Sequence, residues 1–253
     1  MLFSLLAIDF PEDLAWRYLL KLTSFGPRYP GTQGHRLAKE YIIQELSRYT
    51  HPDTQVFFID KIEFTNIYAT FGKGKLKYVI GTHWDTVKDV GANNGASGVA
   101  VLLALADVLA KENLREKIML VFFDGEDYGE LINGSQEFVR RMKEKPEGVV
   151  IIDMVGDKNL EIYAEGFSLA FAREFTEEIF KLAEELGLPS FHREKKYTIK
   201  DDHLPFLRAG IPACLLIDFD YPYWKTPQDT PDKCSKESLG EVGKLLLELI
   251  RRN

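Results

Sequence analysis

Short apolar runs alternate along the chain with longer segments in which apolar residues recur at helical spacing. The short runs predict strands, which we place at 54–60, 66–72, 77–83, 117–124, 148–155, 160–166 and 213–219. The longer segments predict helices at about 12–23, 33–48, 97–112, 133–144, 169–187 and 235–252. The pattern is therefore one of strands and helices that follow each other in turn.

This alternation predicts an α/β fold: a three-layer α/β/α sandwich with a mixed, mostly parallel sheet and helices on both faces. The first two strands follow each other without a helix between them, which indicates an antiparallel edge. Nothing in the 253 residues resembles a linker, so we expect a single domain over 1–253. The apolar opening, 1–8, has no basic flank and runs into a helix that begins near Asp9 or Pro11. We expect it to be packed structure rather than a signal peptide.

Composition narrows the classes of partner and location. A hydrophobic content of 45% and a charged content of 28% are ordinary for a soluble globular protein. The net charge of −7 argues against nucleic acid or an anionic membrane surface as a partner, and no apolar stretch is long enough to span a membrane. Cys214 lies in an apolar strand, which favours a buried free thiol, and with Cys234 as the second of two cysteines we expect a cytoplasmic location. Scarce Asn and Gln beside plentiful Lys and Glu hint at a thermophile.

Polar residues gather where the apolar runs end, and the carboxyl ends of parallel strands meet at one rim of a sheet. Taken singly, each is more often a helix cap, a loop-ordering acceptor or a packing residue. Together, so many like charges on one rim require a metal ion or protonation, and carboxylates with histidine are typical of zinc sites. The side chains concerned are His83, Asp85, Asn93, Asn94, Asp124, Glu126, Asp127, Asp153, Asp157, Asp201, Asp202 and His203.

Seven ordered segments that extend over nearly the whole chain carry a resemblance. They are "FGPRYPGTQGHRLAKEYI", "GTHWDT", "GANNGASGVAVLLALADVLA", "FFDGEDYG", "IIDMVGD", "DDHLPFLRAGIP" and "YWKTPQDT". In this order and spacing they resemble the zinc-dependent aminopeptidase and glutaminyl cyclase (glutaminyl-peptide cyclotransferase) family. "DDHLPFLRAGIP" followed by Trp224 looks closer to the glutaminyl cyclase branch. The resemblance implies a zinc-exopeptidase-like fold and action on peptide N-termini.

The resemblance also implies a set of site residues. In the aminopeptidases two zinc ions are held, one by the equivalents of His83 and Asp153, the other by those of Asp127 and residue 225, with residue 94 bridging both. The cyclases bind one zinc through the equivalents of residues 94, 127 and 225.

Further roles follow from the same resemblance. Glu126 is implied as general acid/base, with Asp153 and Asp201 as a hydrogen-bonded carboxylate pair beside it. Trp224 and Tyr223 remain as walls for a substrate pocket.

Two positions depart from the family pattern, which has Asp at the place of Asn94 and His at the place of Lys225. A neutral amide is a poor bridge between cations, and a protonated lysine has no lone pair with which to bind one. Asp to Asn and His to Lys together add the charge of one zinc ion. We therefore hypothesise that the Lys225 ammonium group stands in for a lost zinc and pairs with Asp127. The alternatives are that Lys225 points into solvent, or that one weak metal stays on His83 and Asp153.

Two classes of function remain. In one, the protein is an active zinc enzyme on peptide N-termini: a cyclase in which zinc polarises the γ-amide of glutamine while Glu126 moves the proton, or an aminopeptidase with a zinc-bound water. In the other it is a pseudoenzyme, a non-catalytic protein whose acidic cleft binds a peptide N-terminus or a small amine-bearing ligand. The loss of two ligand positions favours the second class.

Overall fold

The computed structural model describes residues 9–129 and 132–252. The helices are α1 (Glu12–Thr23), α2 (Gln33–Leu46), α3 (Ala96–Leu109), α4 (Asn133–Arg141), α5 (Gly166–Phe171), α6 (Arg173–Glu185), α7 (Leu204–Arg208) and α8 (Lys236–Arg251), with a short 3₁₀ turn at Pro231–Lys233. The strands are β1 (Asp53–Ile59), β2 (Ile62–Phe71), β3 (Leu76–His83), β4 (Lys117–Phe123), β5 (Gly148–Asp153), β6 (Ile162–Ala164), β7 (Phe191–Lys195) and β8 (Ala213–Ile217). The predicted packing of 1–8 lies outside the described residues.

The main sheet has six strands in the order β1-β2-β4-β3-β5-β8. β4, β3, β5 and β8 run parallel, whereas β1 pairs antiparallel with β2 and β2 pairs antiparallel with β4. The mixed, mostly parallel sheet and its antiparallel edge are therefore confirmed. β6 and β7 form a separate two-stranded parallel sheet.

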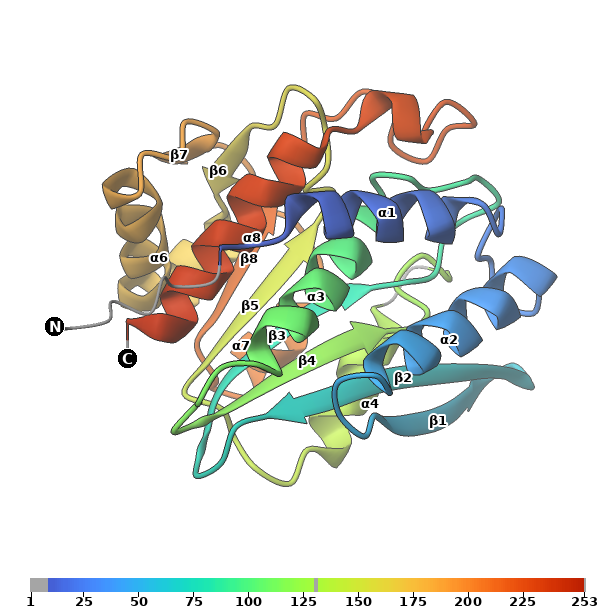
Figure 1. Ribbon diagram of the computed structural model, residues 1–253, viewed down its shortest axis with the longest axis horizontal. Coiled ribbons are helices and arrows are strands. Elements are labelled where there is room, and N and C mark those ends of the chain that lie inside the picture. The colour runs from blue at the N-terminus through green and yellow to red at the C-terminus, as the bar shows by residue number, and fades with distance from the viewer. Residues whose placement is uncertain (1–8, 130–131, 253) are drawn as a thin grey trace, which may run out of the picture.

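Apolar side chains are buried on both faces of the main sheet, which explains why its central strands are apolar throughout. One core packs α1, α2, α3, α6 and α8 against the sheet, and a second packs α4 and α7 against the opposite face. Figure 1 shows α1, α2, α3 and α8 in front of the strands, α6 at the left, and α4 and α7 behind the strands. The predicted three-layer α/β/α arrangement is confirmed.

Three details of the predicted elements are wrong. The helix expected at 169–187 is two helices, α5 and α6, because the backbone bends at Ala172, where φ is −142°. Strand β7 was not predicted, since "FHREK" is mostly exposed and carries no apolar alternation. The short helix α7 was not predicted either; it begins next to Pro205, a residue favoured in the first turn of a helix.

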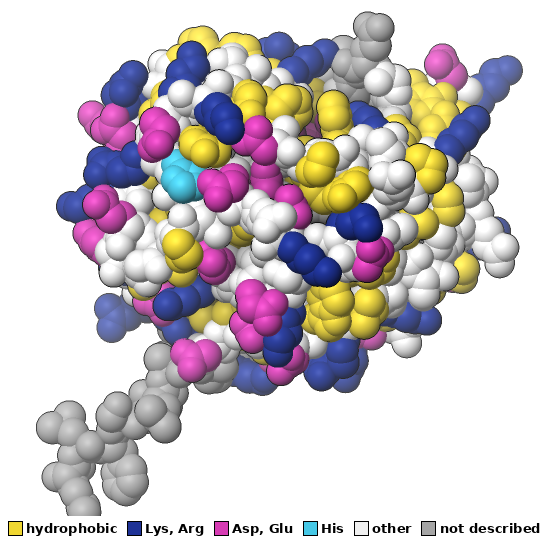
Figure 2. All heavy atoms as spheres, turned by 90° about the horizontal axis from the view of Figure 1, so that it is seen from above, with side chains coloured by type: hydrophobic (Ala, Val, Ile, Leu, Met, Phe, Trp, Pro, Cys, Tyr) yellow, Lys and Arg dark blue, Asp and Glu magenta, His cyan; other side chains and the backbone are white. Residues whose placement is uncertain are grey.

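Side chains of one kind gather on one face of the molecule. The face seen from above in Figure 2 carries acidic side chains around its centre, with hydrophobic and basic side chains beside them. None of the helices in the described part of the chain is both long enough and apolar enough to cross a membrane. Cys214 and Cys234 are both buried free thiols.

Candidate functional site

Strand register brings the predicted site residues to one rim of the sheet. His83 at the end of β3 lies opposite Phe123 at the end of β4, and Asp153 at the end of β5 lies opposite Ile217. The loops that follow these four strand ends therefore start side by side. His83, Glu126 and Asp127 each offer one atom with a lone pair, and these atoms all lie within 4.8 Å of one another.

One ion pair and two hydrogen bonds hold the Asp127 carboxylate. The Lys225 ammonium group lies 2.8 Å from Asp127 Oδ1, and Asn94 Nδ2 donates to Oδ2 at 2.6 Å. The backbone N–H of Val87 also donates to Oδ2, at 3.2 Å. The hypothesis that Lys225 pairs with Asp127 is confirmed, and the alternative that Lys225 extends freely into solvent is wrong. Burial lowers the pKa of Lys225, but Asp127 more than offsets this and the pKa is raised overall.

Both ring nitrogens of His83 have partners. Its Nε2 lies 3.1 Å from Asp153 Oδ1, and its Nδ1 lies 3.2 Å from the backbone carbonyl of Asp85 and 3.5 Å from Asp85 Oδ1. Burial opposes the charged imidazolium, yet Asp153 and Asp85 raise the pKa of His83 well above its ordinary value. A protonated His83 has no lone pair to offer a metal.

The turn that carries Glu126 is fixed by a second buried carboxylate. Asp85 accepts hydrogen bonds from the backbone N–H groups of Glu126, at 3.1 Å, and Asp127, at 3.0 Å. The preceding residue, Gly125, has φ of +83°, a conformation that glycine adopts without strain. A Cβ there would also lie 2.9 Å from the Phe64 ring. Asp85 therefore sets where the Glu126 and Asp127 side chains point.

Two residues that hold the loop around Asn94 were not identified from the sequence. Arg28 is fully buried and donates to the carbonyls of Trp84, Val90, Gly91 and Asn94. Asp229 accepts from the backbone N–H groups of Asn93 at 2.8 Å and Asn94 at 3.0 Å. Both lie in segments that carried the family resemblance, "FGPRYPG" and "KTPQDT". The available signal was a charged residue near proline: Arg28 directly follows one, and Asp229 has one two residues away on each side.

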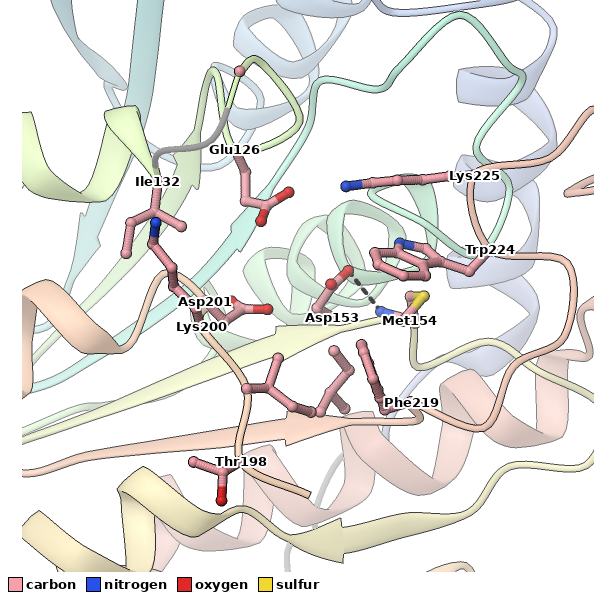
Figure 3. Close-up of a pocket in the computed structure, with 13 residues that line it drawn as sticks. Glu126, Ile132, Asp153, Met154, Thr198, Lys200, Asp201, Phe219, Trp224 and Lys225 are labelled. Atoms are coloured by element: carbon pink, nitrogen blue, oxygen red, sulfur yellow. Dashed lines mark hydrogen bonds between the residues drawn. The ribbon is translucent and has the colours of Figure 1, made fainter. Parts of the chain in front are cut away.

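A cavity of about 330 Å³ opens beside these residues. Its acidic side is formed by Glu126, Asp153 and Asp201, whose carboxyl groups face a common space with the Lys225 ammonium group in Figure 3. The remaining lining residues are Gly129, Ile132, Met154, Thr198, Ile199, Lys200, Ile217, Phe219 and Trp224.

The two predicted pocket walls lie differently. Trp224 lines the cavity and packs against Phe219, with ring centroids 5.4 Å apart. Tyr223 is not among the described lining residues; its ring packs against Tyr221 instead, at 5.6 Å. Trp224 with Phe219 therefore forms the aromatic part of the cavity wall.

Burial makes several carboxyl groups in this cluster hard to ionise. It raises the pKa of Glu126 well above its usual value and that of Asp201 to about 6, with neighbouring carboxylates adding to each shift. Asp153 Oδ1 accepts from His83 and from the backbone N–H of Met154. The charge of Asp153 adds to the rise in the Asp201 pKa, and the hydrogen-bonded carboxylate pair implied by the resemblance stays a prediction. A buried carboxyl group with a raised pKa can act as acid or base near neutral pH.

The residues present do not fit a zinc ion held through positions 94, 127 and 225. Lys225 offers no lone pair, and Asn94 directs its NH₂ group, a donor, at Asp127. Asp127 alone remains of the three, whereas a catalytic zinc needs three protein ligands. A different group, His83, Glu126 and Asp127, lies close enough together to hold a metal. Two of these three residues already have partners, because His83 pairs with Asp153 and Asp127 pairs with Lys225.

The sheet topology and the carboxylate-rich rim define an α/β protein of the zinc-exopeptidase type. Residues 66–250 match the model of peptidase family M28, so the chain belongs to this family. It is 25% identical to the glutaminyl-peptide cyclotransferase of Bos taurus, over 87% of this chain and 76% of that protein.

Solved structures give the same result. The chain resembles the glutaminyl cyclase of Tannerella forsythia, with a TM-score of 0.91 and 29% identity, covering 97% of this chain and all of that one. It also resembles a Zn-dependent exopeptidase of Parabacteroides distasonis, with a TM-score of 0.93 and 27% identity, covering 98% of this chain and all of that one. The family resemblance and the predicted fold class are confirmed.

Proposed function

We propose that this member of peptidase family M28 binds the N-terminal amine of a peptide, or a small amine-bearing ligand, in an acidic cleft that holds no zinc. The observation that carries the proposal is the 2.8 Å contact between Lys225 Nζ and Asp127 Oδ1, with Asn94 on the other oxygen. These contacts balance the charge of a buried carboxylate without a metal ion.

The acidic side of the cavity supplies the acceptors for an amine. Glu126, Asp153 and Asp201 line it, and a ligand ammonium group has three N–H donors to share among them. Lys225 balances Asp127, and His83 lies between Asp85 and Asp153, so the cluster still holds more acidic than basic groups. A bound cation relieves repulsion among the remaining carboxyl groups.

Metal analysis and calorimetry together test the proposal. Protein purified without added metal, then incubated with ZnCl₂ and desalted, is expected to carry far less than one zinc per chain by plasma mass spectrometry. A tripeptide amide is expected to bind with chelator present, and its N-acetylated form is not. About one zinc per chain, or equal binding of the acetylated peptide, would contradict the proposal.

A second candidate is an enzyme with an altered metal site, and one observation favours it: the lone-pair atoms of His83, Glu126 and Asp127 lie within 4.8 Å of one another. A metal there must displace Lys225 from Asp127 and meet a neutral His83. The candidate predicts that zinc binding rises with pH, because His83 must lose its proton before its nitrogen can bind the metal. The zinc incubation, repeated between pH 6 and 9, separates the two candidates.

A further inference from the structure

The Lys225 ammonium group has hydrogen-bonding capacity that Asp127 does not use. An ammonium group has three N–H donors, and the Lys225 ammonium forms an ion pair with Asp127 Oδ1 at 2.8 Å. In the part of the chain that the structure describes, this ammonium forms no second ion pair or hydrogen bond. The Lys225 side chain is 37% exposed, so a ligand in the cavity can reach the other donors.

The loop fixes the direction in which Lys225 points. Its φ is +54°, a left-handed conformation that a long side chain seldom adopts, so the loop imposes it. The next residue closes the turn: the backbone N–H and hydroxyl of Thr226 donate to the Tyr223 carbonyl at 3.1 and 2.8 Å. The Trp224 ring lies 4.7 Å from the ammonium group, within cation–π range. Figure 3 shows the ammonium group pointing across the cavity toward Glu126.

The cavity therefore has two chemically different sides within about 330 Å³, near the lower end of the range for small-ligand sites. Glu126, Asp153 and Asp201 attract an amine, whereas Lys225 donates to an acceptor. A ligand with an amine and a nearby acceptor satisfies both sides at once. An N-terminal residue whose own side chain ends in an oxygen has this chemistry.

We propose that Lys225 makes the site selective for peptides with an acidic N-terminal residue, whose side-chain carboxylate it binds while the α-amine occupies the acidic side. The inference rests on the proposed function, because it presupposes that the amine is bound. A hydrogen bond between an ammonium and a carboxylate is roughly twice as strong as one between neutral groups. The order of affinity is therefore N-terminal Glu, then Gln, then an apolar residue of similar length.

Charge balance supports the same order. A neutral N-terminal residue brings only its positive amine, which leaves the free donors of Lys225 without an acceptor and adds a third cation to the two lysines, Lys200 and Lys225, that line the cavity. An N-terminal Glu brings a negative charge together with the positive one, so each meets its opposite. Loss of a hydrogen bond to a charged group typically costs a site tenfold or more in affinity.

Calorimetry on the full chain at pH 7 with chelator tests this inference. The ligands are Glu-Ala-Ala-amide, Gln-Ala-Ala-amide, norleucyl-Ala-Ala-amide and N-acetyl-Glu-Ala-Ala-amide. Glu-Ala-Ala-amide is expected to bind roughly tenfold or more tightly than the norleucyl peptide. Lys225→Gln is expected to reduce this ratio to about one, and Lys225→Arg to keep most of it. Lys233→Gln is the matched control, since Lys233 also contacts an aromatic ring of this loop, Tyr223, but does not line the cavity.

The outcomes distinguish the inference about Lys225 from the proposed function. Equal affinity for the Glu and norleucyl peptides overturns the inference but leaves the proposed function standing if acetylation still abolishes binding. Equal binding of the acetylated peptide overturns both. A preference for Glu that persists in Lys225→Gln overturns the role of Lys225. The double variant Lys225→Met, Asp127→Asn removes both charges together, so it leaves no unpaired buried carboxylate; it folds and loses the preference if the inference is correct.

Discussion

The side-chain amide of Asn94 donates to Asp127 at 2.6 Å, on the carboxylate oxygen opposite the one that Lys225 contacts. The two residues that depart from the family pattern therefore share one partner. A change at either one alters the charge that the other must balance, so their effects on stability and on metal binding are not additive. The double variant is then more informative than either single variant.

Restoring both family residues is expected to restore metal binding. Asn94→Asp with Lys225→His adds two ligands to Asp127, which gives the three protein ligands that a catalytic zinc requires. After incubation with ZnCl₂ and desalting, the double variant should carry about one zinc per chain by plasma mass spectrometry. The single variants, each with two of the three ligands, should carry much less. A double variant that folds but binds no zinc would show that these positions do not converge on a metal.

Asn94→Asp alone is expected to destabilise the protein by about 1–3 kcal/mol. The change turns a hydrogen-bond donor into a second carboxylate next to Asp127, and both are buried. Urea unfolding at pH 7 measures the loss, and Asn113→Asp, at an exposed position, is the control, expected to stay within about 0.5 kcal/mol. An unchanged unfolding free energy would mean that Lys225 alone balances two carboxylates.

Arg28→Met is expected to cost about 3 kcal/mol or more. The substitution keeps the apolar length of the side chain but leaves buried carbonyls of the 84–94 loop without donors and removes the cation near Asp85 and Asp229. Arg36→Met, at an exposed position, is the matched control. Hydrogen exchange should show faster exchange confined to the 84–94 loop at low urea. Equal effects of the two variants would contradict the role given to Arg28.

Stability should depend on pH through Glu165. Burial raises the pKa of this carboxyl group, but His203 and the backbone N–H groups of Phe167 and Ser168 lower it further, to about 2, from an ordinary value of 4.5. The folded pKa is below the unfolded one, so the stabilisation is complete above pH 4.5 and is lost as the pH falls toward 2.

Glu165→Gln should therefore reduce the unfolding free energy by about 2 kcal/mol at pH 7, with a smaller difference at pH 3. Urea unfolding across this range measures it. The same difference at both pH values would show that Glu165 is not ionised in the folded protein. The Nε2 atom of His203 lies 3.1 Å from Glu165 Oε2. His203 is therefore a packing residue, which was one of the roles expected from the sequence.

The parts of the fold that hydrophobic pattern determines could be predicted. Strands β3, β4, β5 and β8 are buried apolar runs, and their carboxyl ends carry the polar groups of the site. Strand β7 could not be predicted because its pairing with β6, not its own composition, makes it a strand. Tertiary context overrides propensity there.

One ion pair of the site could be predicted from charge. The pairing of Lys225 with Asp127 was predicted from the family resemblance, because Asn94 and Lys225 add two positive charges relative to the family pattern. The hydrogen bonds of Arg28 to backbone carbonyls could not be predicted, because a backbone acceptor leaves no trace in the sequence.

The cation that neutralises Asp127 is part of the polypeptide. A bound ion must be supplied by the surroundings, and the fraction of sites it fills depends on its free concentration. Lys225 arrives with the chain itself, at one equivalent, and needs no loading step. Under the proposed function, folding of this rim does not depend on the metal concentration around the protein, and zinc depletion leaves the rim folded.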